Sequence, residues 1–100
     1  MVLSAEMDEL TFEWDPAKAE ANLTKHGISL DEASKVFADA LAQVLPEPGR
    51  SPGEDRAIMM GHSDRGRLLV VVFTEREERI RIISARVATR REQREYEEHT

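Results

Sequence analysis

The segment RLLVVVFTEREERIRIISAR, residues 67–86, holds the two clearest extended patterns of the chain. Residues 68–73 form a run of six apolar residues, which is typical of a strand covered on both sides or placed in the middle of a sheet. From Arg79 onward arginine alternates with isoleucine, which is typical of a strand with one buried face. The residues between the two patterns are few enough for a hairpin. We therefore predict antiparallel strands at Leu68 to Thr74 and Arg79 to Ala85, joined by a turn at Arg76-Glu77.

Helix start and stop signals surround this hairpin. Asp15-Pro16 is an N-cap followed by proline at the first helical position, and Gly27 is a usual residue for a helix end. Ser29-Leu30-Asp31-Glu32 and Thr89-Arg90-Arg91-Glu92 both match the capping box. These signals predict helices over residues 16–26, 30–38 and 90–98. The remaining patterns predict strands over residues 10–14, 41–45 and 57–61, a loop over residues 46–53 and a turn over residues 63–66.

The predicted order is strand, helix, helix, four strands, helix. This order indicates an α+β domain in which two N-terminal helices pack on an antiparallel sheet of about four to five strands, with a C-terminal helix. The longest apolar run cannot span a bilayer, and the acidic start lacks a signal-peptide pattern, so we expect a cytoplasmic protein without membrane contact. The chain has no cysteine, and its three histidines lack the spacing of a zinc motif. We therefore expect no metal and no other cofactor.

The charged residues are distributed unevenly. The net charge is −6, but residues 61–100 hold nine of the eleven arginines against eight acidic residues. Arginine presents a rigid fork that matches phosphate or carboxylate oxygens at two points. The arginines therefore either bind a polyanion or form surface ion pairs with neighbouring glutamates.

Two stripes are candidates for polyanion binding. Lys18, Asn22, Lys25 and His26 recur at helical spacing on the first helix, where they either hold a phosphodiester or form a solvated face. On the last strand, Arg79 and Arg81 share a face opposite Ile80 and Ile82, and Arg86 lies at the strand end. If Arg67 lies on the same face, these guanidinium groups converge on one surface. The alternative is cross-strand pairing with Glu75, Glu77 or Glu78.

Several segments together resemble one family. They are Phe12-Glu13-Trp14-Asp15, Lys18, Asn22, Lys25-His26-Gly27, Glu54-Asp55-Arg56, residues 66–71, residues 81–86, Arg90-Arg91 and Glu95-Tyr96-Glu97. This ordered set resembles the BrnT family over about residues 10–98, a single domain that follows an acidic leader at residues 1–9. The resemblance implies a toxin of a type II toxin-antitoxin system with a RelE-like fold and a ribonuclease activity that inhibits translation. It also implies a BrnA-like ribbon-helix-helix antitoxin, a toxin-antitoxin heterotetramer, and operator DNA contact through the antitoxin alone.

RNA cleavage without metal needs a proton-transfer group and cations beside the phosphate. His26 is the candidate for proton transfer, because imidazole titrates near neutrality. Arg67, Arg81 and Arg86 are the candidates for stabilising the phosphorane. Lys18, Lys25, Arg79 and Arg90 are candidates for contacts with the RNA backbone. The alternative function is a non-catalytic module whose arginine-rich sheet face binds an acidic partner or nucleic acid.

Overall fold

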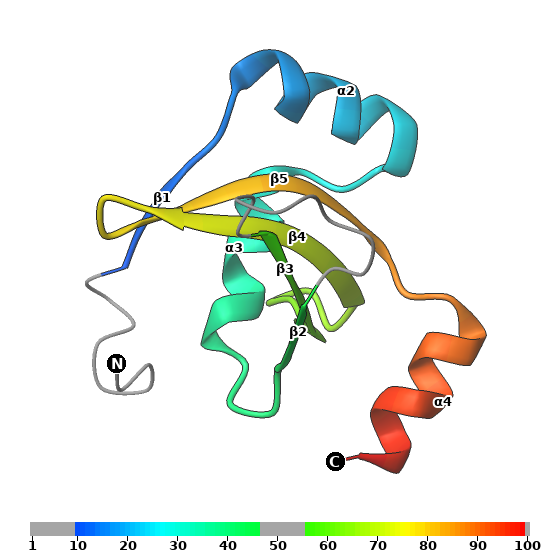
Figure 1. Ribbon diagram of the computed structural model, residues 1–100. Helices are drawn as coiled ribbons and strands as arrows, with labels where there is room; N and C mark the ends of the chain where they lie inside the picture. The colour runs from blue at the N-terminus through cyan, green and yellow to red at the C-terminus, as the bar shows by residue number, and fades with distance from the viewer. Residues whose placement is uncertain (1–9, 47–55, 100) are drawn as a thin grey trace.

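Five strands of the chain pair into one sheet, and helices lie on both sides of it (Figure 1). The computed structural model describes residues 10–46 and 56–99, and all elements below lie within these ranges. The strand order is β1-β5-β4-β3-β2. In chain order the elements are β1 (Thr11–Glu13), α2 (Pro16–His26), α3 (Leu30–Ser34), the 3-10 helix η2 (Lys35–Ala38), β2 (Gln43–Pro46), β3 (Arg56–His62), β4 (Leu68–Arg76), β5 (Arg79–Val87) and α4 (Arg90–Glu98). The predicted α+β class is confirmed, whereas the leader at residues 1–9 and most of the predicted loop lie outside the described residues.

The predicted hairpin forms the centre of the sheet. β4 is the middle strand and pairs antiparallel with both β3 and β5. The turn consists of Glu77 and Glu78, whose φ angles are 52° and 66°. One strand departs from the antiparallel prediction, because β1 pairs parallel with β5. No short turn joins these two strands in the chain, so turn geometry does not constrain their relative direction.

The capping signals define the helix ends. The Asp15 carboxylate accepts the N–H of Ala17 at 2.9 Å, and α2 ends at Gly27, whose φ of 71° lies in the left-handed region that glycine tolerates. Thr89 and Glu92 form the complete predicted capping box of α4. The second predicted helix differs from the prediction in its last turn, because it is α-helical only as far as Ser34 and continues as a 3-10 helix to Ala38.

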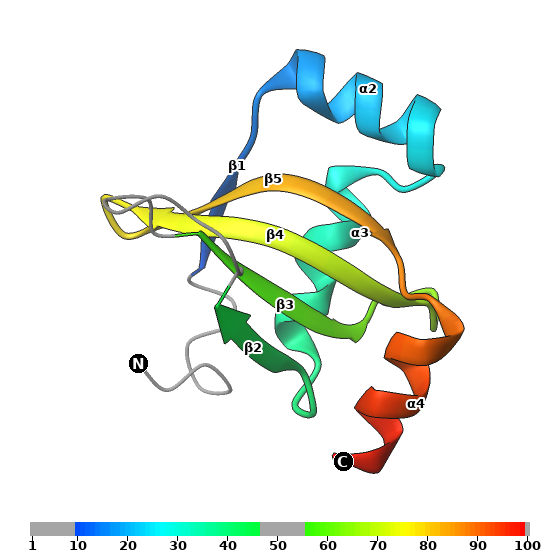
Figure 2. The ribbon, with the colours of Figure 1, turned by 45° about the vertical axis from the view of Figure 1, so that its right-hand side comes forward.

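Two apolar clusters hold the layers together. The larger cluster lies between the sheet and the α3–η2 segment, and the smaller one lies under α4 on the opposite sheet face. Figures 1 and 2 show α2 along β5 and α3 behind the sheet. The buried members of the larger cluster are Ile28, Leu30, Ala33, Val36, Phe37, Met59, Leu69, Val71, Phe73, Ile80, Ile82 and Ala85, and those of the smaller one are Met60, Leu68, Val70, Ala88 and Tyr96.

Candidate functional site

A β-bulge in β5 decides which arginines share a face. The β4–β5 register shifts between Val72 and Phe73: Phe73 is opposite Ile82, but Val72 is opposite Ser84. Ile83 is therefore the extra residue on β5. A bulge of this kind inserts one residue and reverses the alternation of side chains beyond it.

The bulge brings Arg86 to the face of Arg81. Without an extra residue, two positions five apart on a strand point to opposite faces. In the structure Ile82 and Ala85 both lie in the larger core, with 2% and 0% of their surfaces exposed. Arg81 and Arg86 are opposite Thr74 and Val70 of β4, so both lie on the other face. The strand pattern of the sequence places only Arg79 and Arg81 together, and the tertiary structure adds Arg86.

Glu13 of β1 holds the first part of this arginine face. Arg81 Nη1 donates to Glu13 Oε2 at 2.6 Å, and Arg79 Nη1 lies 3.6 Å from Glu13 Oε1. The hydrogen bond from Arg81 lowers the pKa of Glu13 below its ordinary value, and Arg79 adds to this effect. The predicted alternative of ion pairing is therefore observed for Arg81, but the carboxylate comes from the parallel strand β1 and not from the glutamates near the hairpin turn.

Glu92 of α4 holds the second part of the face. Arg86 Nη1 and Nη2 donate to the two oxygens of Glu92 at 2.7 and 2.9 Å, a bidentate pair. The same carboxylate accepts the backbone N–H of Thr89 at 2.8 Å. These bonds, chiefly the one from Arg86, lower the pKa of Glu92 to about 2. The pair ties the end of β5 to the first turn of α4.

Arg67 does not join Arg81 and Arg86. Its Nε donates at 2.9 Å to Glu32 of α3, its Nη2 donates to the other oxygen of that carboxylate, and Ser63 Oγ donates to Glu32 at 2.7 Å. The Glu32 side chain is 6% exposed, and the hydrogen bond from Arg67 lowers its pKa. Because α3 covers the opposite face of the sheet, Arg67 does not lie on the face of Arg81 and Arg86, and the condition for convergence of all these guanidinium groups is not met. Because its carboxylate binds Arg67 and Ser63, Glu32 contributes to the predicted capping box of α3 through its backbone N–H, which donates to Ser29 Oγ at 3.0 Å.

The polar stripe of α2 is divided in the structure. Asn22 is buried: its Nδ2 donates to the carbonyl oxygens of Ile28 and Ala85, both at 2.9 Å, and its Oδ1 accepts the N–H of Ala85 at 3.1 Å. Its amide therefore satisfies the free edge of β5 as a neighbouring strand would. The other stripe residues, Lys18, Lys25 and His26, are exposed.

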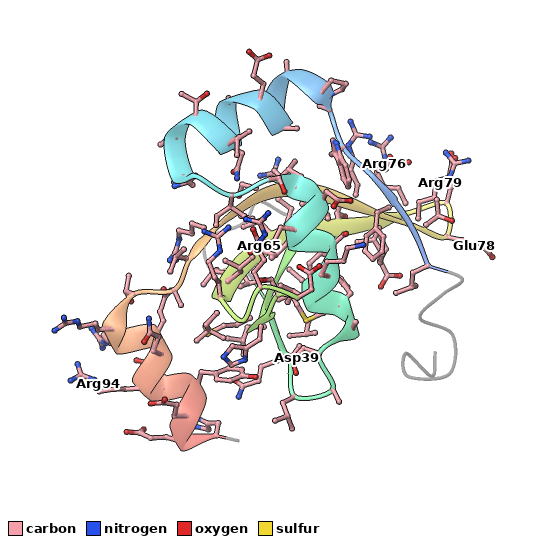
Figure 3. The ribbon with its side chains drawn as sticks, turned by 180° about the vertical axis from the view of Figure 1, so that it is seen from behind. Asp39, Arg65, Arg76, Glu78, Arg79 and Arg94 are labelled. Atoms are coloured by element: carbon pink, nitrogen blue, oxygen red, sulfur yellow. The ribbon has the colours of Figure 1, made fainter. Side chains whose placement is uncertain are left out.

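The two remaining predicted RNA contacts lie at opposite ends of the molecule. Figure 3 shows Arg79 near the tip of the β4–β5 hairpin with Arg76 and Glu78, whereas Arg94 marks α4 at the far end. Arg90, the first residue of α4, is exposed. A strand of RNA that contacts both Arg79 and Arg90 must therefore follow the length of β5.

Asp39, His62 and Tyr96 form a second polar cluster, which the sequence patterns do not predict. Asp39 Oδ2 accepts the backbone N–H of His62 at 2.7 Å and the hydroxyl of Tyr96 at 3.3 Å. The Nδ1 of the His62 ring lies 3.6 Å from the same oxygen, and this ring meets that of Tyr96 edge to face at 5.6 Å. Figure 3 shows Asp39 between η2 and α4. These residues come from three distant segments, so no spacing in the sequence signals the cluster.

His62 lies between two concavities of the surface. The larger has a volume of about 500 Å³ and the smaller about 350 Å³, and His62 lines both. Partial burial raises the pKa of the Asp39 carboxyl, but the hydrogen bonds that this carboxyl accepts outweigh burial and lower the pKa below its ordinary value. The larger concavity is lined by Leu41, His62, Gly66, Arg67, Leu68, Val87, Gln93, Tyr96 and Glu97, and the smaller one by Lys35, Ala38, Asp39, His62, Ser63 and Asp64.

The described residues contain neither a membrane-spanning helix nor a cluster of metal-ligating side chains. No helix within residues 10–46 and 56–99 is long and apolar enough to cross a membrane. In the same ranges no three histidine, aspartate or glutamate side chains are grouped as metal ligands.

Comparison with known proteins gives one family. The model of the ribonuclease toxin BrnT of type II toxin-antitoxin systems matches residues 14–92. The fold is similar to that of the Brucella abortus ribonuclease toxin BrnT, with a TM-score of 0.64 and 23% sequence identity over 81% of this chain and 99% of that chain. No curated protein sequence matches the chain.

Proposed function

We propose, since this chain belongs to the BrnT family of ribonuclease toxins of type II toxin-antitoxin systems, that it cleaves RNA without a metal ion and thereby inhibits translation in the cytoplasm. The observation that carries the proposal within this chain is the face of β5, where the bulge aligns Arg81 with Arg86. Their side chains are 36% and 41% exposed, so both guanidinium groups are accessible to a phosphate.

The arginine face suits the charge that develops during cleavage. When the ribose 2′-oxygen attacks phosphorus, the bond to the 5′-oxygen breaks and negative charge accumulates on the phosphoryl oxygens. Arg81 and Arg86, held by Glu13 and Glu92, are already oriented and retain further N–H donors. Their partners Thr74 and Val70 are four positions apart on β4, so the two arginines contact different phosphates of an RNA strand that follows β5. Arg67 contributes from the opposite face only if the RNA passes around the end of the sheet. Its role, and those of Lys18, Lys25, Arg79 and Arg90, stay predictions.

Proton transfer is assigned to a histidine. The sequence predicts His26 for this role, and in the structure His26 is the last residue of α2 and lies outside both concavities. The arginine face of β5 and the Asp39 cluster contain arginine, carboxylate, tyrosine and histidine side chains. Of these types, histidine is the one whose ordinary pKa allows it to accept and release a proton near neutral pH.

Neutralisation requires a protein partner, which we propose to be a ribbon-helix-helix antitoxin that forms a heterotetramer and contacts operator DNA itself. Support comes from apolar side chains around the edge strand β2: Leu41, Val44 and Leu45 are 63%, 55% and 46% exposed. Exposed apolar groups that lie close together are typical of protein interaction surfaces.

The test is cleavage of purified RNA by the purified chain in excess EDTA. Cleavage should persist, and Arg81→Ala should lower the rate by roughly 100-fold at every pH. Arg81→Lys should also be slow, because an ammonium group cannot reproduce the two-point contact of guanidinium. Arg91→Ala is the matched control, since Arg91 is 84% exposed and pairs with Glu95 of the same helix.

Three results would contradict the proposal. Loss of cleavage in EDTA with recovery on adding a divalent ion would replace it with a metal-dependent reaction. Equal rates for Arg81→Ala and Arg91→Ala would remove the arginine face from the mechanism. Intact RNA under all conditions, together with tight binding of RNA or an acidic protein, would favour the non-catalytic binding module.

A further inference from the structure

We propose that His62 is the proton-transfer group of this ribonuclease and that the larger concavity beside it binds one nucleotide of single-stranded RNA. The inference rests on the proposed function and names the residue and subsite that act in it. It depends on three features of the described residues: the carboxylate behind the His62 ring, the exposure of that ring, and the chemistry of the concavity walls.

The Asp39 carboxylate lies beside the His62 ring. The carboxylate accepts the backbone N–H groups of Leu41 and His62, and it shares the single proton of the Tyr96 hydroxyl with the carbonyl oxygen of Leu41. Its side chain is 17% exposed, and its Oδ2 lies 3.6 Å from His62 Nδ1. This separation is longer than a hydrogen bond, but a negative carboxylate beside Nδ1 favours a proton on that nitrogen and leaves the other nitrogen for the substrate. His62 Nε2 is therefore available for proton transfer.

Exposure and surroundings distinguish His62 from the other histidines. The His62 side chain is 49% exposed and lines both concavities, so a substrate can reach it while Asp39 supports it from behind. His26 lines neither concavity. The Nδ1 of His99 lies 2.7 Å from the carbonyl oxygen of Glu95, at the end of α4. Of the three, His62 alone combines access, a neighbouring carboxylate and a concave surface.

The walls of the larger concavity match the parts of a nucleotide. A volume of about 500 Å³ falls within the usual size of small-ligand sites. Leu41 and Val87, which are 63% and 44% exposed, offer apolar contact for a base, and Gln93 offers an amide oxygen for its edge. Arg67 directs Nε and Nη2 to Glu32, so its Nη1 keeps two donors for the phosphate.

In the proposed step, His62 Nε2 removes the proton of the ribose 2′-hydroxyl. The 2′-oxygen forms a bond to phosphorus, the bond between phosphorus and the 5′-oxygen breaks, and the 5′-oxygen takes a proton from solvent water. The products are a 2′,3′-cyclic phosphate and a 5′-hydroxyl, and the imidazolium returns its proton to solvent. The negative charge of Asp39 lies beside the ring while it is positive.

The pH profile tests this role. The titratable and charged groups that face His62 come from several elements: Lys35, Asp39, Asp64, Arg67, Tyr96 and Glu97. With RNA as substrate, the wild type should lose activity toward acid pH, because a general base must be unprotonated to accept the 2′-hydroxyl proton. His62→Ala should lower kcat/KM by at least about 100-fold and abolish that acid limb. Added imidazole should restore part of the activity to His62→Ala but none to Arg81→Ala.

His99→Ala is the matched control and should keep the wild-type rate and profile. His62→Ala with wild-type rate and profile would overturn the inference, and loss of the acid limb in His26→Ala instead would assign the role to His26. In both cases the proposed ribonuclease function would stand. Circular dichroism checks that each variant is folded.

A binding measurement keeps the inference testable even if the wild type fails to cleave RNA. The probe is a dinucleotide with 2′-deoxyribose, which cannot be cleaved by this route, added to protein with isotope-labelled histidine. The ring signals of His62 should shift on addition while those of His99 stay unchanged. No shift at His62 at millimolar probe would overturn the nucleotide subsite, independently of any cleavage result.

Discussion

Replacement of Asn22 by alanine should destabilise the fold more than replacement of any other α2 residue by alanine, because Asn22 is the buried residue of this helix. Asn22 is 6% exposed, and its side chain makes three hydrogen bonds, of 2.9, 2.9 and 3.1 Å, to backbone groups of Ile28 and Ala85. Alanine leaves the N–H and C=O of Ala85 and the C=O of Ile28 without these partners. The change also separates α2 from β5 beside the bulge that places Arg86.

The expected loss can be worked from these bonds. An unsatisfied buried polar group costs about 1–3 kcal/mol, and water that enters the small cavity recovers part of this. The free energy of unfolding should therefore fall by about 3–5 kcal/mol, a large share of the 5–15 kcal/mol typical of a domain. Asn22→Asp should cost at least as much, because it replaces the donating amide with a carboxylate oxygen that faces two carbonyl oxygens.

Urea denaturation followed by circular dichroism measures this loss. Thr24→Ala is the matched control, since Thr24 is an exposed residue of the same helix and should change the free energy of unfolding by less than about 0.5 kcal/mol. A loss below about 1 kcal/mol for Asn22→Ala, with an unchanged urea dependence, would refute the reasoning. It would mean that Asn22 does not carry the contact between α2 and β5.

Three further predictions concern stability. The folded-state pKa of Glu92 is about 2 against an ordinary 4.5, so the Arg86 pair stabilises the protein above pH 4.5 and this stability is lost as pH falls through 2. Glu92→Gln should therefore lower the free energy of unfolding by about 2 kcal/mol at pH 7, as measured by urea denaturation. An equal loss at pH 2 would contradict this origin. Glu77→Asn with Glu78→Gly should raise stability by about 1 kcal/mol, because the native φ angles of 52° and 66° suit those residues better; an unchanged urea midpoint would contradict it. Gly61→Ala should cost about 1–3 kcal/mol, since its Cβ would lie 2.8 Å from Ala42 Cβ and 3.0 Å from Val36 Cγ1; wild-type stability would show that these neighbours yield freely.

The sequence by itself determined the elements whose stabilising partners are close along the chain. The Asp15, Ser29 and Thr89 caps bind backbone N–H groups two or three residues away, so both partners are visible in one short window. The same holds for the hairpin of β4 and β5, whose strands are separated by two turn residues. The family resemblance, confirmed over residues 14–92, likewise rests on an ordered set of short segments.

The tertiary structure alone decided where the functional side chains point. The bulge at Ile83 turns Arg86 toward the face of Arg81, whereas a regular alternation would place the two side chains on opposite faces. Arg67 meets Glu32 from 35 residues away, Arg81 meets Glu13 from 68 residues away, and Asp39 gathers His62 and Tyr96 from two other segments. Such contacts depend on which strands become neighbours and on which face each helix covers, and no local pattern of residue types contains that information.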